Sequence, residues 1–152
     1  MIKDLANFQK RIGINFHNQK LLTKCFTHKS YNPVENNEKL EFLGDRVLGL
    51  IISEKLLEKF PDEKEGIIDK KFANLVNKKT CVNIAKKLNL KKYLFLGSSN
   101  KNLERSSDKI LSDSLEAIVG AIYLDGGIKV SQKFILNFWS SFIDKSVITL
   151  ID

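Results

Sequence analysis

Apolar residues recur along most of this chain at the three- and four-residue spacing of helices that pack one face against a core. The spacing predicts helices and no convincing strand, at residues 3–11, 18–25, 37–59, 65–78, 80–88, 108–124 and 130–147. Proline, which interrupts helices, occurs only at Pro33 and Pro61, on either side of the segment 37–59. The pattern predicts one all-α domain around this central segment, with residues 98–108 as a polar, mobile loop.

The central segment contains two acids, Glu41 and Asp45, in a mostly apolar run. Four residues apart on a helix, they point the same way, and Asn36 or Asn37 is placed to cap that helix. Because apolar residues surround nearly the whole circumference, we expect this helix to be buried. Buried carboxylates cost free energy unless a cation or a hydrogen bond compensates them. The sequence therefore predicts either basic partners or a bound metal ion.

A second acid pair, Asp113 and Glu116, shares one face of the predicted helix 108–124. The same face carries Ala117 and Gly120, whose small side chains allow another backbone to approach closely. We therefore expect the four carboxylates to face one another, in a cluster suited to hard divalent cations such as Mg²⁺. From spacing alone, the alternative of a buried ion-pair network remains open and is favoured. Its candidate basic partners are Lys39, Arg46 and Lys70.

The chain has 152 residues, with 25 Lys and Arg against 18 Asp and Glu and a formal net charge of +7. Lysine doublets recur at 70–71, 78–79, 86–87 and 91–92. This excess fits a polyanionic partner. A genome rich in A and T would also place lysine wherever the surface permits, and the lysines alone do not distinguish RNA from DNA.

Other features restrict the class and location of the protein. With 43% hydrophobic residues, the chain suits one globular domain, and no apolar run approaches the roughly 20 residues of a membrane span. The N-terminal residues show no secretory signal. Cys25 and Cys81 lie far apart in apolar helical patterns, which predicts reduced core thiols. We expect a cytoplasmic protein with no membrane segment.

Five segments, taken in order, resemble the ribonuclease III family. Residues 37–48 resemble its acidic signature, and residues 111–127 resemble its second acidic helix. The remaining matches are Leu21-Leu22 followed by Phe26-Thr27-His28-Lys29-Ser30-Tyr31, then Phe60-Pro61 and Glu65-Gly66, then Ala73-Asn74-Leu75-Val76. The resemblance extends from about residue 8 to residue 142.

The resemblance implies a helical endonuclease domain over residues 1–152, without the family's C-terminal double-stranded-RNA-binding domain. It further implies a magnesium-dependent endoribonuclease, with Mn²⁺ as a substitute ion, that hydrolyses phosphodiester bonds in double-stranded RNA. The family acts as a homodimer and processes ribosomal precursor, messenger and other structured RNAs. Two metal ions about 3.5–4 Å apart are one way to perform such hydrolysis.

The resemblance also assigns roles to the four acids. It implies Glu41, Asp45, Asp113 and Glu116 as the metal site, with Asp45 and Glu116 as the catalytic residues. Arg46 departs from the common family pattern, in which a small residue often follows the Asp.

Four further positions match family features, each with a simpler explanation. Glu38 and Glu65 match acids near the active valley, although an acid at a helix N-terminus explains each. His28 falls in a segment on the RNA-contacting face, although a capping or core histidine is the alternative. Phe42 matches an aromatic residue that packs across a two-fold dimer interface, and the alternative is a simple core residue.

Two competing functions remain open from the sequence. One is a noncatalytic RNA-binding or ribosome-associated relative, which the four intact acids disfavour. The other is a helical metal-dependent phosphohydrolase acting on nucleotides. The chain has only two histidines, His17 and His28, so it lacks the histidine-rich ligand sets that we expect of such an enzyme.

Overall fold

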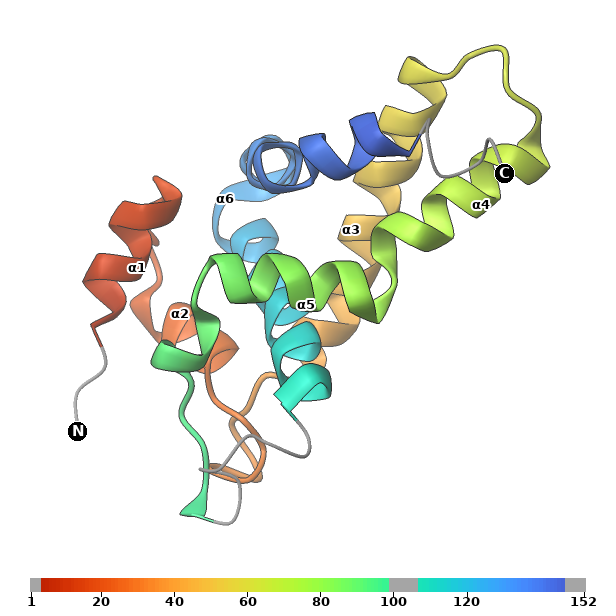
Figure 1. Ribbon diagram of the computed structural model, residues 1–152. Helices are drawn as coiled ribbons and strands as arrows, with labels where there is room; N and C mark the ends of the chain where they lie inside the picture. Colours follow the sequence, from red (N-terminus) through yellow and green to blue (C-terminus); the bar gives the residue numbers. More distant parts are fainter. Residues whose placement is uncertain (1–3, 99–106, 147–152) are drawn as a thin grey trace.

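The computed structural model describes residues 4–98 and 107–146, and the predicted loop 98–108 therefore falls largely outside the described residues. Described helices are α1 (Leu5–Ile12), α2 (Gln19–Cys25), α3 (Glu38–Lys59), α4 (Glu65–Val76), α5 (Lys78–Lys87), the 3₁₀ helix η1 (Leu90–Tyr93) and α6 (Ser107–Lys145) (Figure 1). In this part of the chain, extended backbone pairs only at a bridge between Thr27 and Phe95. The all-α prediction is confirmed.

Two local breaks define the helices in the second half of the chain. Asn77 has extended backbone (φ −71°, ψ 166°), which ends α4, and its side-chain oxygen accepts a hydrogen bond from the Thr80 amide to begin α5. Gly127 interrupts α6 with a φ of +86°, a conformation that favours glycine. The two predicted helices 108–124 and 130–147 are therefore the halves of α6, joined at this kink.

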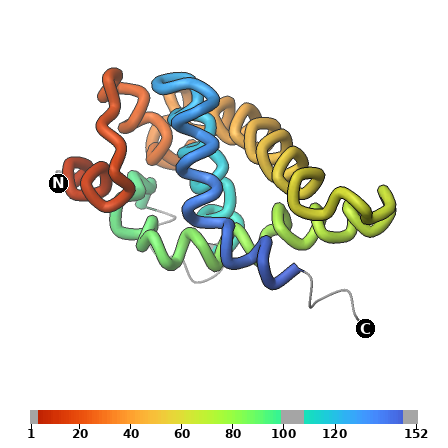
Figure 2. The backbone as a smooth tube through the Cα atoms, turned by 90° about the horizontal axis from the view of Figure 1, so that it is seen from above, coloured from red at the N-terminus to blue at the C-terminus, as the bar shows by residue number. Residues whose placement is uncertain are grey.

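The first half of α6 packs against α3 at the centre of the molecule, and α1 and α4 lie at opposite ends (Figures 1 and 2). The two central helices touch at Gly44 and Gly120. A Cβ atom on Gly44 would lie 1.6 Å from the Glu116 carbonyl oxygen, and one on Gly120 would lie 2.2 Å from the Leu40 carbonyl oxygen. Glycine at both positions lets the backbones meet, which brings the acid-bearing turns of the two helices together.

The prediction that the helix 37–59 is buried all round is wrong on one face. Leu48, Ile51 and Ile52 are buried, but Phe42, Leu50 and Leu57 are each more than 60% exposed. These three side chains lie within about 80° of one another around the helix axis. We call them the exposed face of α3; a simple core role for Phe42 is thereby excluded.

The two cysteines lie in the core, as the sequence predicts. Cys25 and Cys81 are free and buried, and burial raises the pKa of both thiols, that of Cys81 to about 12. Trp139 is fully buried, and its indole nitrogen donates to the Leu75 carbonyl at 2.9 Å. Among the described residues, no helix is long and apolar enough to cross a membrane.

Candidate active site

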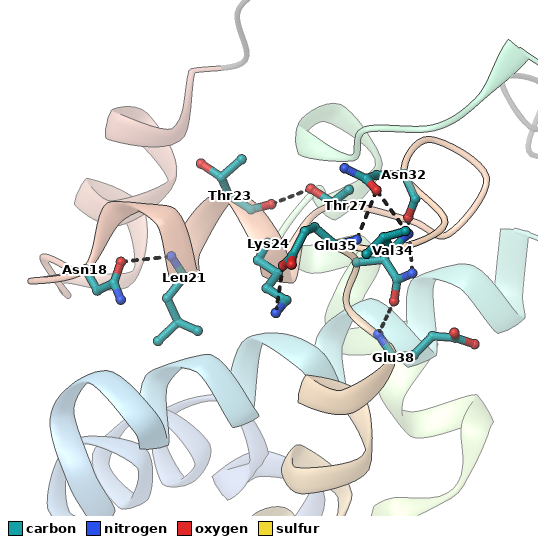
Figure 3. A network of polar contacts seen from close by, with 10 residues as sticks. Asn18, Leu21, Thr23, Lys24, Thr27, Asn32, Val34, Glu35 and Glu38 are labelled. Carbon is teal, nitrogen blue, oxygen red and sulfur yellow. Dashed lines mark hydrogen bonds and ion pairs between the residues drawn. The ribbon is translucent and has the colours of Figure 1, made fainter.

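The start of α3 is fixed by a polar loop that joins it to α2 (Figure 3). The Asn32 side-chain oxygen accepts hydrogen bonds from the Val34 and Glu35 amides, and Lys24 pairs with Glu35 at 3.1 Å. Asn36 donates to the Asn32 carbonyl at 3.1 Å, which completes a compact turn. These bonds set the direction in which the chain enters α3.

Asn36 and Asn37 divide the capping role that the sequence left open between them. Asn36 is the side-chain cap, because its oxygen accepts from the Glu38 amide at 3.1 Å. Asn37 is buried, and its side chain donates to the Cys25 carbonyl at 3.2 Å while its amide donates to the Thr27 carbonyl at 2.9 Å. Asn37 therefore anchors α3 to the end of α2, one turn before Glu41.

The structure brings three of the four predicted acids into one cluster where α3 and α6 cross. Carboxylate oxygens of Glu41, Asp113 and Glu116 lie within 4.8 Å of one another. Asp45 lies one turn beyond Glu41 on α3, outside this three-carboxylate cluster, and its carboxyl group contributes to the raised pKa of Glu116. We call these four residues the acidic site.

Mutual repulsion and partial burial make this site costly to ionise. Burial, followed by the hydrogen bond and charge of Asp45, raises the pKa of Glu116 to about 9. Burial and the neighbouring Asp113 raise the pKa of Glu41 to about 7. Both shifts have the sign expected of carboxylates that lack a sufficient positive charge.

Basic side chains supply part of that charge. The Lys109 ammonium donates to Asp113 at 2.7 Å, and Arg46 lies 3.4 Å from Asp45. Of the partners considered from the sequence, only Arg46 pairs with an acid; Lys39 and Lys70 form no ion pair within the described residues. Sequence reasoning missed Lys109, although its position four residues before Asp113 on the same helix was a usable signal.

A cavity of about 280 Å³ opens beside the acidic site. Its lining residues are His28, Lys29, Asn37, Glu38, Glu41, Lys109, Ile110, Asp113 and Ser114. Of the secondary candidates, Glu38 and His28 therefore line the cavity, and Glu38 lies 3.8 Å from Lys29. Glu65 is exposed in the first turn of α4 and does not line this cavity.

His28 is held in one orientation by its neighbours. Its Nδ1 accepts from the Ser30 amide at 3.1 Å, so we infer that Nε2 carries the proton of the neutral ring. Burial and the charge of Lys29 lower the pKa of His28. Ser30 in turn accepts from the Gly97 amide at 2.9 Å. A Cβ on Gly97 would lie 2.2 Å from the Ser30 carbonyl oxygen, a contact between distant segments that the sequence did not reveal.

The acidic site suits a hard divalent cation. Glu41, Asp113 and Glu116 offer only oxygen ligands, from two helices whose positions are fixed by backbone contact. Oxygen-only sites favour Mg²⁺, Ca²⁺ or Mn²⁺ over softer metals. A cation here would also offset the repulsion that raises the pKa of Glu41 and Glu116.

Two crossing helices that carry a cluster of three carboxylates define an all-α protein with a carboxylate site at its centre. The sequence model of the family described as ribonuclease-III-like matches residues 18–141. The chain belongs to this ribonuclease-III-like family.

Individual relatives agree with this assignment. The chain is 59% identical to ribonuclease 3 of Pelagibacter ubique over 95% of its own length and 65% of that protein. It is 43% identical to ribonuclease 3 of Nitratiruptor sp. over 90% of its length and 61% of that protein. The chain thus spans less than two thirds of the length of these curated relatives.

Solved structures show the same fold. One is a nuclease domain of ribonuclease III from Campylobacter jejuni, described for structural flexibility in a region involved in its dimer formation. It has a TM-score of 0.85 and 37% identity, and the match covers 94% of this chain and 98% of that one. Dicer from Pichia stipitis has a TM-score of 0.71 at 22% identity, over 91% of this chain and 61% of that one. The second likeness concerns the fold alone.

Proposed function

We propose that this chain is a magnesium-dependent endoribonuclease domain that hydrolyses phosphodiester bonds in double-stranded RNA. The observation that supports this most is the cluster of Glu41, Asp113 and Glu116 at one helix crossing, with Asp45 one turn further along α3. Membership of the ribonuclease-III-like family supports the reaction class.

Each acid has a proposed role in this reaction. Glu41, Asp113 and Glu116 would hold Mg²⁺, or Mn²⁺ in its place, and Asp45 would complete the ligand set from the side of Glu116. A bound ion would stabilise charge on the phosphoryl oxygens and lower the pKa of the attacking water. Asp45 and Glu116 are the proposed catalytic residues, as the resemblance to the family implies, and the effect of Asp45 on the pKa of Glu116 supports this pairing.

Glu38 and His28 belong to the proposed RNA-facing wall of the site. Both line the cavity beside the acids, together with Lys29 and Lys109, whose ammonium groups would attract the backbone phosphates. For Glu65, the position in the first turn of α4 supports the helix-terminus explanation more than a place in the site.

Lysines on α5 support a polyanionic substrate. Lys78, Lys79 and Lys86 line an open groove of about 480 Å³, and none of them pairs with an acid within the described chain. Helix α5 packs against α6, the helix that carries Asp113 and Glu116. Unpaired cations on this helix suit A-form RNA, which proteins recognise by shape, phosphates and 2′-hydroxyls.

The exposed face of α3 supports a homodimer as the working form. Phe42, Leu50 and Leu57 together present an apolar surface that a second copy would cover. Two-fold contacts between identical faces are the commonest oligomer geometry. In such a dimer each acidic site would cut one strand of the duplex.

We extend the proposal to the biological role that the resemblance implies. This is cytoplasmic processing of ribosomal precursor, messenger and other structured RNAs. The assignment of residues 1–152 to an endonuclease domain is part of the same proposal.

A cleavage assay tests the proposal. The chain should cut a plain RNA duplex in Mg²⁺ and not in EDTA. Glu116→Gln, which keeps the volume but removes one anionic ligand, should bind the duplex and lose nearly all cleavage. The loss of metal stabilisation worth several kcal/mol lowers the rate by about tenfold for each 1.4 kcal/mol. Glu54→Gln, an exposed acid of α3 outside the acidic site, is the matched control.

Two results would contradict the proposal. Near-normal cleavage by Glu116→Gln would remove Glu116 from the site. Binding of RNA without any magnesium-dependent cleavage by the unaltered chain would favour the noncatalytic RNA-binding alternative instead.

A further inference from the structure

One charged side chain lies among the large apolar residues on the exposed face of α3. Arg46 comes one turn after Phe42 and one turn before Leu50, and its side chain is 61% exposed.

Arg46 contacts both the apolar face and the acidic site. Its guanidinium carbon lies 3.9 Å from the centroid of the Phe42 ring, and Nη1 donates to the Phe42 carbonyl at 3.3 Å. The same Nη1 donates to Oδ2 of Asp45 at 3.4 Å. Adjacent side chains on a helix do not face each other, so Arg46 reaches Asp45 only by folding back over Phe42.

Asp45 continues this chain of contacts into the acidic site. Arg46 contacts the Oδ2 atom of Asp45, and the Asp45 carboxyl group lies near enough to Glu116 to raise its pKa, after the larger effect of burial. Glu116 belongs to the three-carboxylate cluster with Glu41 and Asp113. Contacts thus run from Phe42 through Arg46 and Asp45 to the proposed cation ligands.

Docking of a second copy would change the solvent exposure of the Arg46–Asp45 ion pair. In the single chain, the Arg46–Asp45 pair is more than half exposed, and water screens it. A copy that covers Phe42 and Leu50 also removes water from the guanidinium between them. A desolvated cation needs a carboxylate partner, and Asp45 is the only acid within ion-pair distance of Arg46 in the described chain.

We propose that Arg46 is a positioning residue that couples docking of a second copy of this chain to the orientation of the Asp45 carboxylate, and so to cation binding at the acidic site. The inference rests on the dimer and metal site proposed above. Docking strengthens the pair, which holds Oδ2 and keeps the carboxylate directed toward Glu116. Fixing a ligand in its binding orientation raises cation affinity, as outer-shell contacts do in known metal sites.

Thermodynamic linkage makes the inference measurable without any cleavage assay. If docking favours cation binding by a given factor, the cation tightens the dimer by the same factor. This linkage factor is small, because it arises from strengthening one ion pair that is exposed to water before docking. We expect Mg²⁺ to tighten the dimer by about threefold to fivefold.

The experiment measures the dimer dissociation constant by analytical ultracentrifugation, with and without Mg²⁺ at constant ionic strength, for the unaltered chain and three variants. Arg46→Ala should reduce the magnesium effect to less than about 1.5-fold. Arg46→Lys, which keeps the charge but loses the planar group, should retain part of it. Lys55→Ala is the matched control, because it removes a cation paired with Glu58 on the same helix and should leave the effect unchanged.

Each outcome separates a positioning role from a merely structural one. If Arg46 only stabilises the apolar face, Arg46→Ala will weaken the dimer equally with and without Mg²⁺, which overturns the inference but leaves the proposed function intact. Calorimetric titration with Mg²⁺ supplies the second measurement. A chain that neither dimerises nor binds Mg²⁺ would overturn the inference together with the proposed dimer and metal site.

Discussion

The contact between α3 and α6 at Gly44 leads to a quantitative prediction. Gly44→Ala places a Cβ 1.6 Å from the Glu116 carbonyl oxygen, whereas Cβ atoms are essentially never found closer than 3.0 Å to another heavy atom. The two helices must therefore separate by roughly 1.4 Å at their crossing. The obstructing atom belongs to the backbone, so no side-chain rotation relieves the clash.

The expected cost follows from two opposing terms. Overpacking of a core typically costs about 1–3 kcal/mol, and the rigid neighbour places this substitution at the upper end. Alanine gains about 1 kcal/mol over glycine in a helix interior. The net loss of about 2 kcal/mol corresponds to a decrease in Tm of roughly 4–8 °C for a domain of this size.

The same separation should weaken the acidic site. Glu41 and Asp45 move away from Asp113 and Glu116, so we expect Mg²⁺ affinity to fall by about tenfold or more. Differential scanning calorimetry and a magnesium titration measure the two effects. The control is Gly66→Ala in α4, where nothing lies within 4 Å of the added Cβ, and which should not destabilise the fold. A Gly44→Ala variant with an unchanged Tm and unchanged Mg²⁺ binding would refute the packing argument.

Two further predictions concern protonation in the metal-free chain. The pKa of Glu116 is raised to about 9 in the folded chain, from the ordinary value of 4.5. The protonated side chain therefore stabilises the fold fully below about pH 4.5, and this stabilisation is lost as the pH rises toward 9. Glu116→Gln should therefore melt above the unaltered chain at pH 7 and pH 9 but not at pH 4, and an equal difference at all three values would contradict this assignment. Because burial and Lys29 lower the pKa of His28, an NMR titration should give a midpoint below 6.5 that rises in Lys29→Gln; a midpoint above 6.5 would rule this out.

Sequence periodicity was sufficient to predict the helices and the pairing of the acids. Helical spacing placed Glu41 with Asp45 and Asp113 with Glu116, because residues three or four apart necessarily share a helix face. The structure brings Glu41 together with Asp113 and Glu116, as expected, whereas Asp45 lies one turn further along α3. The roles assigned to the individual acids remain predictions that the experiments above will test.

The tertiary structure alone decided which sides of those helices are covered. The apolar circumference of residues 37–59 predicted complete burial, but burial depends on how many neighbours reach a helix, and among the described residues none covers Phe42, Leu50 and Leu57. An apolar face left uncovered in this way has the same local pattern as one that faces the core.

Contacts between distant segments were also beyond the sequence. Gly97 meets Ser30 across 67 positions, and Asn37 reaches back to the end of α2. Arg46 was recognised as a departure from the family pattern, but its fold over Phe42 toward Asp45 depends on the rotamer that this surface permits. Local spacing determines which residues share a helix face, whereas only the packed chain determines what each face meets, because that depends on helix crossings set by residues far apart in the sequence.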